Sequence, residues 1–185
     1  MEKFVTALFY KFFKDEYVVV RTARFDDIAK KIDMIIVNKK TGQVIGAFDA
    51  VVGDTESQRV KEKEQKTFAT NCQDDGKLVY GIGVKDNKLV KLSRDSVPVM
   101  YLDLSRHELM KCISDIDLSK DGISTLEAKT MNEFLKSIGE QLDQVDIFKK
   151  FDADSDLRKT YNALQEKVAN RTARKLGGNN NQNQF

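Results

Sequence analysis

The stretch FDDIAKKIDMIIVNKKTGQVIGAFDAVV, residues 25–52, decides the fold of this chain. Two segments rich in valine, isoleucine and phenylalanine flank a short polar connection that ends in a glycine, the residue that a three-residue hairpin loop needs at its positive-φ position. This pattern predicts a pair of antiparallel strands. Counting outward from a loop at residues 40–42 places Asp33 opposite Asp49.

These two aspartates are unusual inside an apolar hairpin. Residues directly opposite share a face with Cβ atoms roughly 4.5 to 5.5 Å apart, so Asp33 and Asp49 would repel each other unless a cation lay between them. Carboxylates of this kind suit Mg²⁺. If the register differs by one residue, the two side chains lie on opposite faces and no such site forms.

Composition sets wider limits. The chain has 185 residues, of which 41% are hydrophobic, enough for the core of one domain. Its net charge of +2 is too small to indicate nucleic-acid binding. Cys72 and Cys112 are far apart and favour a reducing compartment over a disulfide framework or zinc site. The N-terminal segment is too interrupted by lysines to span a membrane, so we expect a cytoplasmic protein with no membrane partner.

Hydrophobic periodicity and turn residues predict the remaining elements. We expect helices at residues 2–15, 55–72 and 156–175, helices beginning at the capping boxes of Ser105 and Ser124, and strands at 17–23, 33–37, 43–52, 78–85, 89–92 and 99–104, with a turn at 26–27. This order predicts an α/β core at 1–116. A helical extension at 117–176 offers a surface for a protein partner, and an Asn/Gln-rich tail at 177–185 is expected to be disordered.

The same order, with the segments RFDDIAKKIDMIIVNKKTGQVIGAFDAVV, KLVYGIG and VPVMYLDLS, resembles a divergent branch of the PD-(D/E)XK, or restriction-endonuclease-like, nuclease superfamily. The resemblance covers roughly residues 1 to 116. It implies a mixed β-sheet flanked by helices, and a Mg²⁺- or Mn²⁺-dependent nuclease acting on nucleic-acid phosphodiesters. Asp33 and Asp49 match the two metal-binding acids of that family, and Glu2 or Glu16 matches the acid on its first helix.

The chain departs from the family pattern at the catalytic lysine. Val51 stands where the pattern has lysine, two residues after the second acid. In some members the lysine lies on the following helix, which here offers Lys61, Lys63 and Lys66; Lys31, opposite Val51 in our register, is a further candidate. Residue patterns do not choose among them, and we take Lys63 forward as the predicted catalytic lysine. The alternative is a catalytically inactive nuclease-fold module that binds nucleic acid or protein.

Basic residues near the acid pair suggest how nucleic acid would be held. Arg59, Lys63 and Lys66 lie at i, i+4 and i+7 on the helix after Asp49, and with Arg24 they form the predicted nucleic-acid-binding set. A solvated helix face is the ordinary alternative origin of such a stripe.

Two acidic segments give a weaker, third hypothesis, that of a calcium-responsive helical module. Residues 117–123 copy the first half of an EF-hand loop, but Glu127 falls one position short of the final ligand. A second partial loop at 152–156 lacks the glycine and the final ligand. Helix N-caps are the simpler explanation for both segments. His107, the only histidine, is expected on a helix surface.

Overall fold

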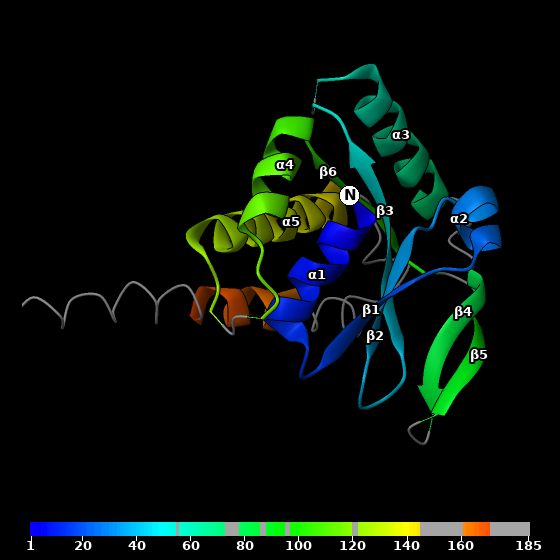
Figure 1. The fold of residues 1–185 in the computed structure, drawn as a ribbon. Coiled ribbons are helices and arrows are strands. Elements are labelled where there is room, and N and C mark those ends of the chain that lie inside the picture. The colour runs from blue at the N-terminus through cyan, green and yellow to red at the C-terminus, as the bar shows by residue number, and fades with distance from the viewer. Residues whose placement is uncertain are drawn as a thin grey trace, which may run out of the picture.

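A four-stranded mixed sheet forms the centre of the molecule in the computed structural model, which describes residues 1–54, 56–72, 78–85, 88–94, 97–119, 122–144 and 161–170 (Figure 1). The strands are β1 (Tyr17–Arg21), β2 (Met34–Asn38), β3 (Val44–Val52) and β6 (Val99–Leu104), in the order β1-β2-β3-β6. β2 is antiparallel to both of its neighbours, β1 and β3, and β6 runs parallel to β3. A separate hairpin is formed by β4 (Leu78–Lys85) and β5 (Lys88–Arg94).

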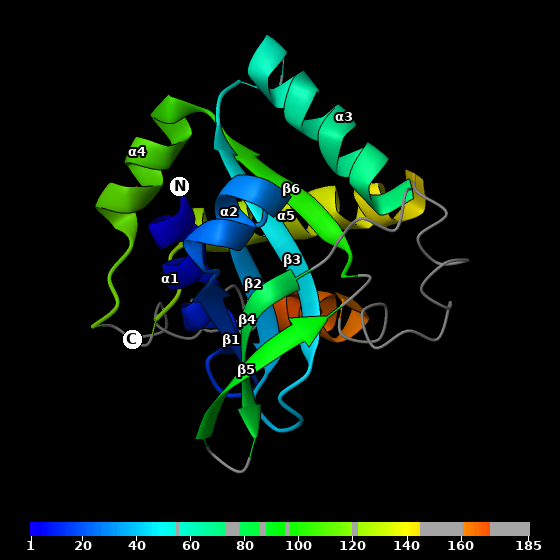
Figure 2. The same cartoon turned by 90° about the vertical axis from the view of Figure 1, so that its right-hand side faces the viewer.

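Helices cover both faces of the sheet. They are α1 (Glu2–Phe13), α2 (Arg24–Lys30), α3 (Gln58–Cys72), α4 (Arg106–Asp115) and α5 (Thr125–Gln144), and residues 161–170 are also helical. α1 and α5 lie against one face, whereas α2, α3 and the β4–β5 hairpin lie on the other side (Figures 1 and 2). α3 connects β3 to its parallel neighbour β6, as a parallel pair requires. The chain therefore has the predicted α/β fold with a mixed sheet flanked by helices.

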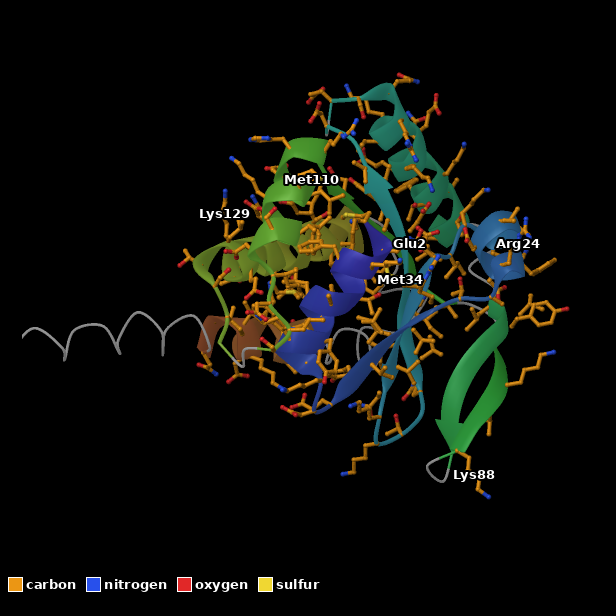
Figure 3. The ribbon with its side chains drawn as sticks, in the orientation of Figure 1. Glu2, Arg24, Met34, Lys88, Met110 and Lys129 are labelled. Atoms are coloured by element: carbon orange, nitrogen blue, oxygen red, sulfur yellow. The ribbon has the colours of Figure 1, made fainter. Side chains whose placement is uncertain are left out.

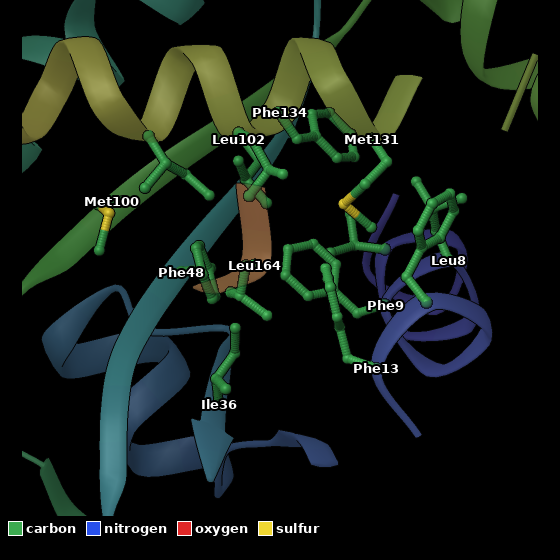
Figure 4. Close-up of a cluster of buried hydrophobic side chains, with 14 of the residues drawn as sticks. Leu8, Phe9, Phe13, Ile36, Phe48, Met100, Leu102, Met131, Phe134 and Leu164 are labelled. Atoms are coloured by element: carbon green, nitrogen blue, oxygen red, sulfur yellow. The ribbon is translucent and has the colours of Figure 1, made fainter. Parts of the chain in front are cut away.

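Successive side chains along each strand point to opposite faces of the sheet, and each face packs into a hydrophobic cluster of its own. Ile36, Phe48 and Met100 point towards the phenylalanines of α1 and the apolar face of α5 (Figure 4). Ile35 and Ala47, one position away, belong to a smaller cluster on the opposite face. Asp49 shares this second face, because it lies two residues after Ala47 on the same strand. The alternation thus turns an acidic side chain towards the helix α3.

The predicted hairpin register is confirmed from Ile36 to Met34 and is wrong at the turn. Gly42 has the expected positive φ of 70°. Val37, however, pairs with Val44, and a β-bulge follows before Ile36 pairs with Gly46. The bulge inserts one extra residue into β3, which restores the predicted register further along the strands. The regular ladder ends at Met34 and Phe48, and the next positions outward are Asp33 and Asp49.

Other boundaries also differ from the sequence expectations. The segment expected to turn at residues 26–27 is instead the helix α2, and the strand expected to reach residue 23 ends at Arg21. Lys31 ends α2 in the left-handed conformation with φ 57°. It therefore lies outside the ladder, and its expected place opposite Val51 is wrong.

The helices after residue 117 pack on the main core. Tyr161, Leu164 and Val168 are buried in the same cluster as α1 and α5. Both capping boxes are confirmed: Ser105 pairs with Glu108, and Ser124 pairs with Glu127. The proposed tail at 177–185 and the acidic segment at 152–156 lie outside the described residues. Within the part of the chain that the structure describes, no helix is long and apolar enough to cross a bilayer.

Candidate functional site

The site is organised around Asp49, which lies on β3 and is only 3% exposed. Lys63 of α3 donates from its Nζ atom to Oδ1 of Asp49 at 2.5 Å and also bonds to Oδ2. Val60 and Thr67 lie about one turn before and one turn after Lys63 on α3, and both are buried. This face of the helix is therefore turned towards the sheet, and Lys63 with it. A buried carboxylate is stable only with such compensation, so the ion pair fixes how the end of β3 meets α3.

Asp33 is held by backbone hydrogen bonds at the start of β2. Its Oδ2 atom accepts from the N–H of Ala50 at 2.8 Å. Its own N–H donates to the carbonyl of Phe48 at 2.9 Å, and its carbonyl accepts from the N–H of Thr22 at 3.0 Å. These bonds tie the residue to β3 on one side and to the end of β1 on the other. The carboxylate is therefore positioned by the sheet itself.

Burial raises the pKa of Asp33 to about 7, far above its usual value of 3.8. The hydrogen bond from Ala50 opposes this shift, while the negative charges of Asp49 and Glu2 add to it; Lys63 lowers the pKa by a smaller amount. Lys63 thus offsets only part of the acidic charge at the site. A further cation at Asp33 would be favoured, because it would stabilise the ionised carboxylate.

Glu2 is the third acidic residue at this end of the molecule. It begins α1 (Figure 3) and forms an ion pair of 2.5 Å with Arg21 at the end of β1. Glu16, the other predicted counterpart of the family's first-helix acid, pairs instead with Lys167 at 2.7 Å. The structure therefore brings Glu2, and not Glu16, into the electrostatic surroundings of Asp33.

Among the candidate lysines, Lys63 is the one placed at the acid pair. Lys61 is exposed and pairs with Glu56 at 2.7 Å, and Lys66 and Lys31 are exposed as well. Val51 is 1% exposed and packs in the interior. The position that the family pattern gives to lysine is thus used for packing, while the ammonium group comes from the next helix.

The predicted basic stripe divides into two parts. Lys63 turns towards Asp49, whereas Arg59 and Lys66 on the same helix are exposed, as is Arg24 at the start of α2. Three of the four residues assigned to nucleic-acid contact therefore face solvent. His107 is also exposed on α4, as expected for a surface helix residue.

The acidic side chains at the site would fill only part of the coordination shell of a metal ion. Among the residues that the structure describes, no group of three or more His, Cys, Asp or Glu side chains converges as a metal cage. Mg²⁺ is commonly held by one or two carboxylates, with water and substrate phosphate as the other ligands. Asp33 and Asp49 would be the carboxylates of such a site, and both oxygens of Asp49 accept hydrogen bonds from Lys63 in this structure.

The acidic segment at residues 117–123 behaves as a turn over its described part. Oδ1 of Asp117 accepts from the N–H of Ser119 at 2.9 Å. Glu127 is already engaged by Ser124, whose N–H donates to it at 2.7 Å, and by Lys11 at 2.6 Å. These bonds give both acids structural roles that explain their presence.

The exposed edge of β6 is closed by two amide side chains, which the sequence reading missed. Asn71 of α3 donates to the carbonyl of Val99 at 2.7 Å and accepts from its N–H at 2.9 Å. Gln141 of α5 makes the same two bonds with Tyr101, at 2.8 and 2.9 Å. The two amides replace a neighbouring strand and anchor α3 and α5 to the sheet.

A pocket of about 270 Å³ lies beside this edge, lined by residues of α3, by Tyr101 and by Gln141. Tyr101 is opposite Asp49 in the parallel ladder, so the pocket adjoins the acid pair. Burial, together with the charge of Glu64, raises the pKa of the Tyr101 hydroxyl, which therefore stays protonated at neutral pH.

The chain matches none of the protein-family models, curated proteins or solved structures with which it was compared.

Proposed function

We propose that this chain is a metal-dependent nuclease that hydrolyses nucleic-acid phosphodiesters. The observation that carries the proposal is the meeting of Lys63, from the helix after β3, with the buried carboxylate of Asp49 beside Asp33. One helix, three antiparallel strands, a crossover helix and a parallel strand follow in this order, with α2 inserted between β1 and β2 and the β4–β5 hairpin inserted between α3 and β6; this order supports a restriction-endonuclease-like fold. The widely spaced cysteines favour a cytoplasmic location.

In this proposal Asp33 and Asp49 hold Mg²⁺ or Mn²⁺, which would supply Lewis-acid stabilisation of the phosphate and an activated water. The N–H of Ala50 fixes the direction of the Asp33 carboxylate. Lys63 is the residue that orients the attacking water and balances the negative charge that develops on the phosphate. Its side chain is 26% exposed, so its ammonium group can leave Asp49 for a substrate without crossing the core.

A second candidate function is binding without catalysis, by an inactive module of the same fold. The observation that favours it is Val51, which is buried at the position where the family pattern places lysine. If the Lys63–Asp49 ion pair serves only to stabilise the fold, the exposed basic residues Arg59 and Lys66 can still contact phosphates.

The two functions are separated by a cleavage assay. Single- and double-stranded DNA and RNA are incubated with the full chain and Mg²⁺, Mn²⁺ or chelator. We expect cleavage that needs the metal and is abolished by Asp49→Asn, which removes a ligand charge but preserves shape. Lys63→Met should also abolish it. Lys61→Met is the matched control, because Lys61 lies on the same helix and also pairs with an acid.

Cleavage that persists in both Asp33→Asn and Asp49→Asn would refute the assigned site. Salt-dependent binding without cleavage of any substrate would instead support the inactive module. Equal loss in Lys63→Met and Lys61→Met would remove the special role of Lys63.

A further inference from the structure

A pair of exposed aromatic rings joins α2 to the hairpin. Phe25 and Tyr80 have ring centroids 5.4 Å apart at an interplanar angle of 77°, yet they remain 49% and 43% exposed. Nζ of Lys91 lies 4.5 Å from the centroid of Tyr80. Ile28, one turn after Phe25 on α2, is 54% exposed. We call Phe25, Ile28, Tyr80 and Lys91 the aromatic platform.

A fully buried carboxylate holds this platform together. Asp26 accepts from the N–H of Val79 at 3.0 Å and from the N–H of Tyr80 at 2.8 Å. These bonds fix the start of β4 against α2, and the two rings are therefore fixed relative to each other. A surface ordered in advance loses less entropy on binding.

A short segment connects the platform to the acid pair. α2 ends at Lys30, Lys31 is its C-cap, and Asp33 follows two residues after Lys31. The Oγ1 atom of Thr22 bonds to the carbonyls of Ile32 and Asp33, which ties this short connection to the end of β1. In both views of the ribbon α2 lies between α3 and the hairpin (Figures 1 and 2). The platform and the residues proposed to act on a ligand are therefore joined by α2 and the three residues that follow it.

Two cations lie near the rings. Nζ of Lys91 lies over the Tyr80 ring, and Arg24, which precedes Phe25 at the start of α2, is exposed (Figure 3). Aromatic side chains for the bases and cations for the phosphates are what proteins use to bind single strands. Base faces are accessible in a single strand, whereas a duplex stacks them inside.

We propose that the aromatic platform binds single-stranded nucleic acid by base stacking and presents it to the acid pair. This inference deepens the proposed nuclease function by naming its substrate as single-stranded. Its test measures binding without cleavage, so the platform and the catalytic site can fail separately.

The experiment uses the full chain carrying Asp49→Asn, without metal. Fluorescence anisotropy follows a labelled oligo(dT) and a labelled duplex of equal length. Phe25→Ala and Tyr80→Ala should each weaken oligo(dT) binding about 5- to 150-fold, the range for loss of one stacked base, and should change duplex binding little. Phe25→Leu keeps an apolar side chain but removes the ring, so it should also weaken binding. Phe25→Trp should preserve it.

The matched control is Tyr10→Ala. Tyr10 is a 52% exposed tyrosine on α1 with Nζ of Lys14 at 5.9 Å from its ring centroid, away from the platform. Absence of oligo(dT) binding, or unchanged affinity in Phe25→Leu and Tyr80→Ala, would overturn the proposal and leave the patch as a protein-binding surface. An equal loss for the duplex, or in Tyr10→Ala, would also overturn it. Cleavage activity in the chain with Asp49 restored reports on the nuclease proposal alone.

Discussion

Replacing Asp33 by asparagine should make the protein more stable, by an amount that grows as the pH rises from about 4 to about 7. The folded-state pKa of Asp33 is about 7, against an ordinary value of 3.8, so the folded protein holds a proton that the unfolded chain releases between these values. Stability contributed by this proton is complete below about pH 4 and is lost as the pH rises through about 7. Asparagine has no charge to bury and can still accept from Ala50.

The size of the effect follows from the same shift. A difference from 3.8 to about 7 corresponds to at most ~4 kcal/mol, at about 1.4 kcal/mol per pKa unit. Solvent reaches part of the side chain and lowers this penalty, so we expect Asp33→Asn to gain about 2 kcal/mol at about pH 8 and only a few tenths of a kcal/mol at about pH 4. Urea denaturation at the two pH values measures the difference.

Asp54→Asn is the control, because Asp54 is an exposed aspartate just beyond the end of β3. It removes the same charge and should show no such pH-dependent gain. A loss of stability in Asp33→Asn at about pH 8, or the same gain at both pH values, would refute the electrostatic argument. Mg²⁺ should stabilise the wild-type chain more than Asp33→Asn, since it binds the ionised carboxylate.

Two further predictions concern packing. Gly139→Ala should destabilise the protein by about 1 to 3 kcal/mol in thermal unfolding, because an added Cβ would lie 3.0 Å from Cζ of Tyr161 and closer still to its hydroxyl. Gly122→Ala is the control and should not destabilise the protein, because the space around Gly122 is open. Asn71→Leu should lower the free energy of unfolding by about 2 to 4 kcal/mol and speed amide exchange on β6, because it removes two buried hydrogen bonds to that strand. Normal stability in Gly139→Ala, or protected amides in Asn71→Leu, would contradict these contacts.

Local sequence patterns predict the elements whose causes are local. The strand at 99–104 has the expected bounds, and the helices after Ser105 and Ser124 start where their capping boxes place them. Gly42 has positive φ because the hairpin loop requires it. In each case the determining contacts lie within a few residues, so the sequence contains the necessary information.

Features that depend on contacts between residues far apart in the sequence are not predicted by local sequence patterns. α2 has only seven residues and is stabilised by Asp26, whose partners on β4 lie 53 and 54 positions away. The bulge in β3 leaves no local pattern, although it decides whether Asp33 lies opposite Asp49. Asn71 and Gln141 are ordinary polar helix residues until β6 is placed beside them.

The position of Lys63 depends on how a helix packs on the sheet. β3 supplies an acid at Asp49 and packing at Val51, and the ammonium group comes from α3, which covers the same face. The distance between acid and lysine therefore depends on how α3 docks on the sheet, because the two residues lie on different elements. Asn71, two turns further along α3, bonds that helix to β6. A loosened helix end should consequently weaken the Lys63–Asp49 contact as well as the fold.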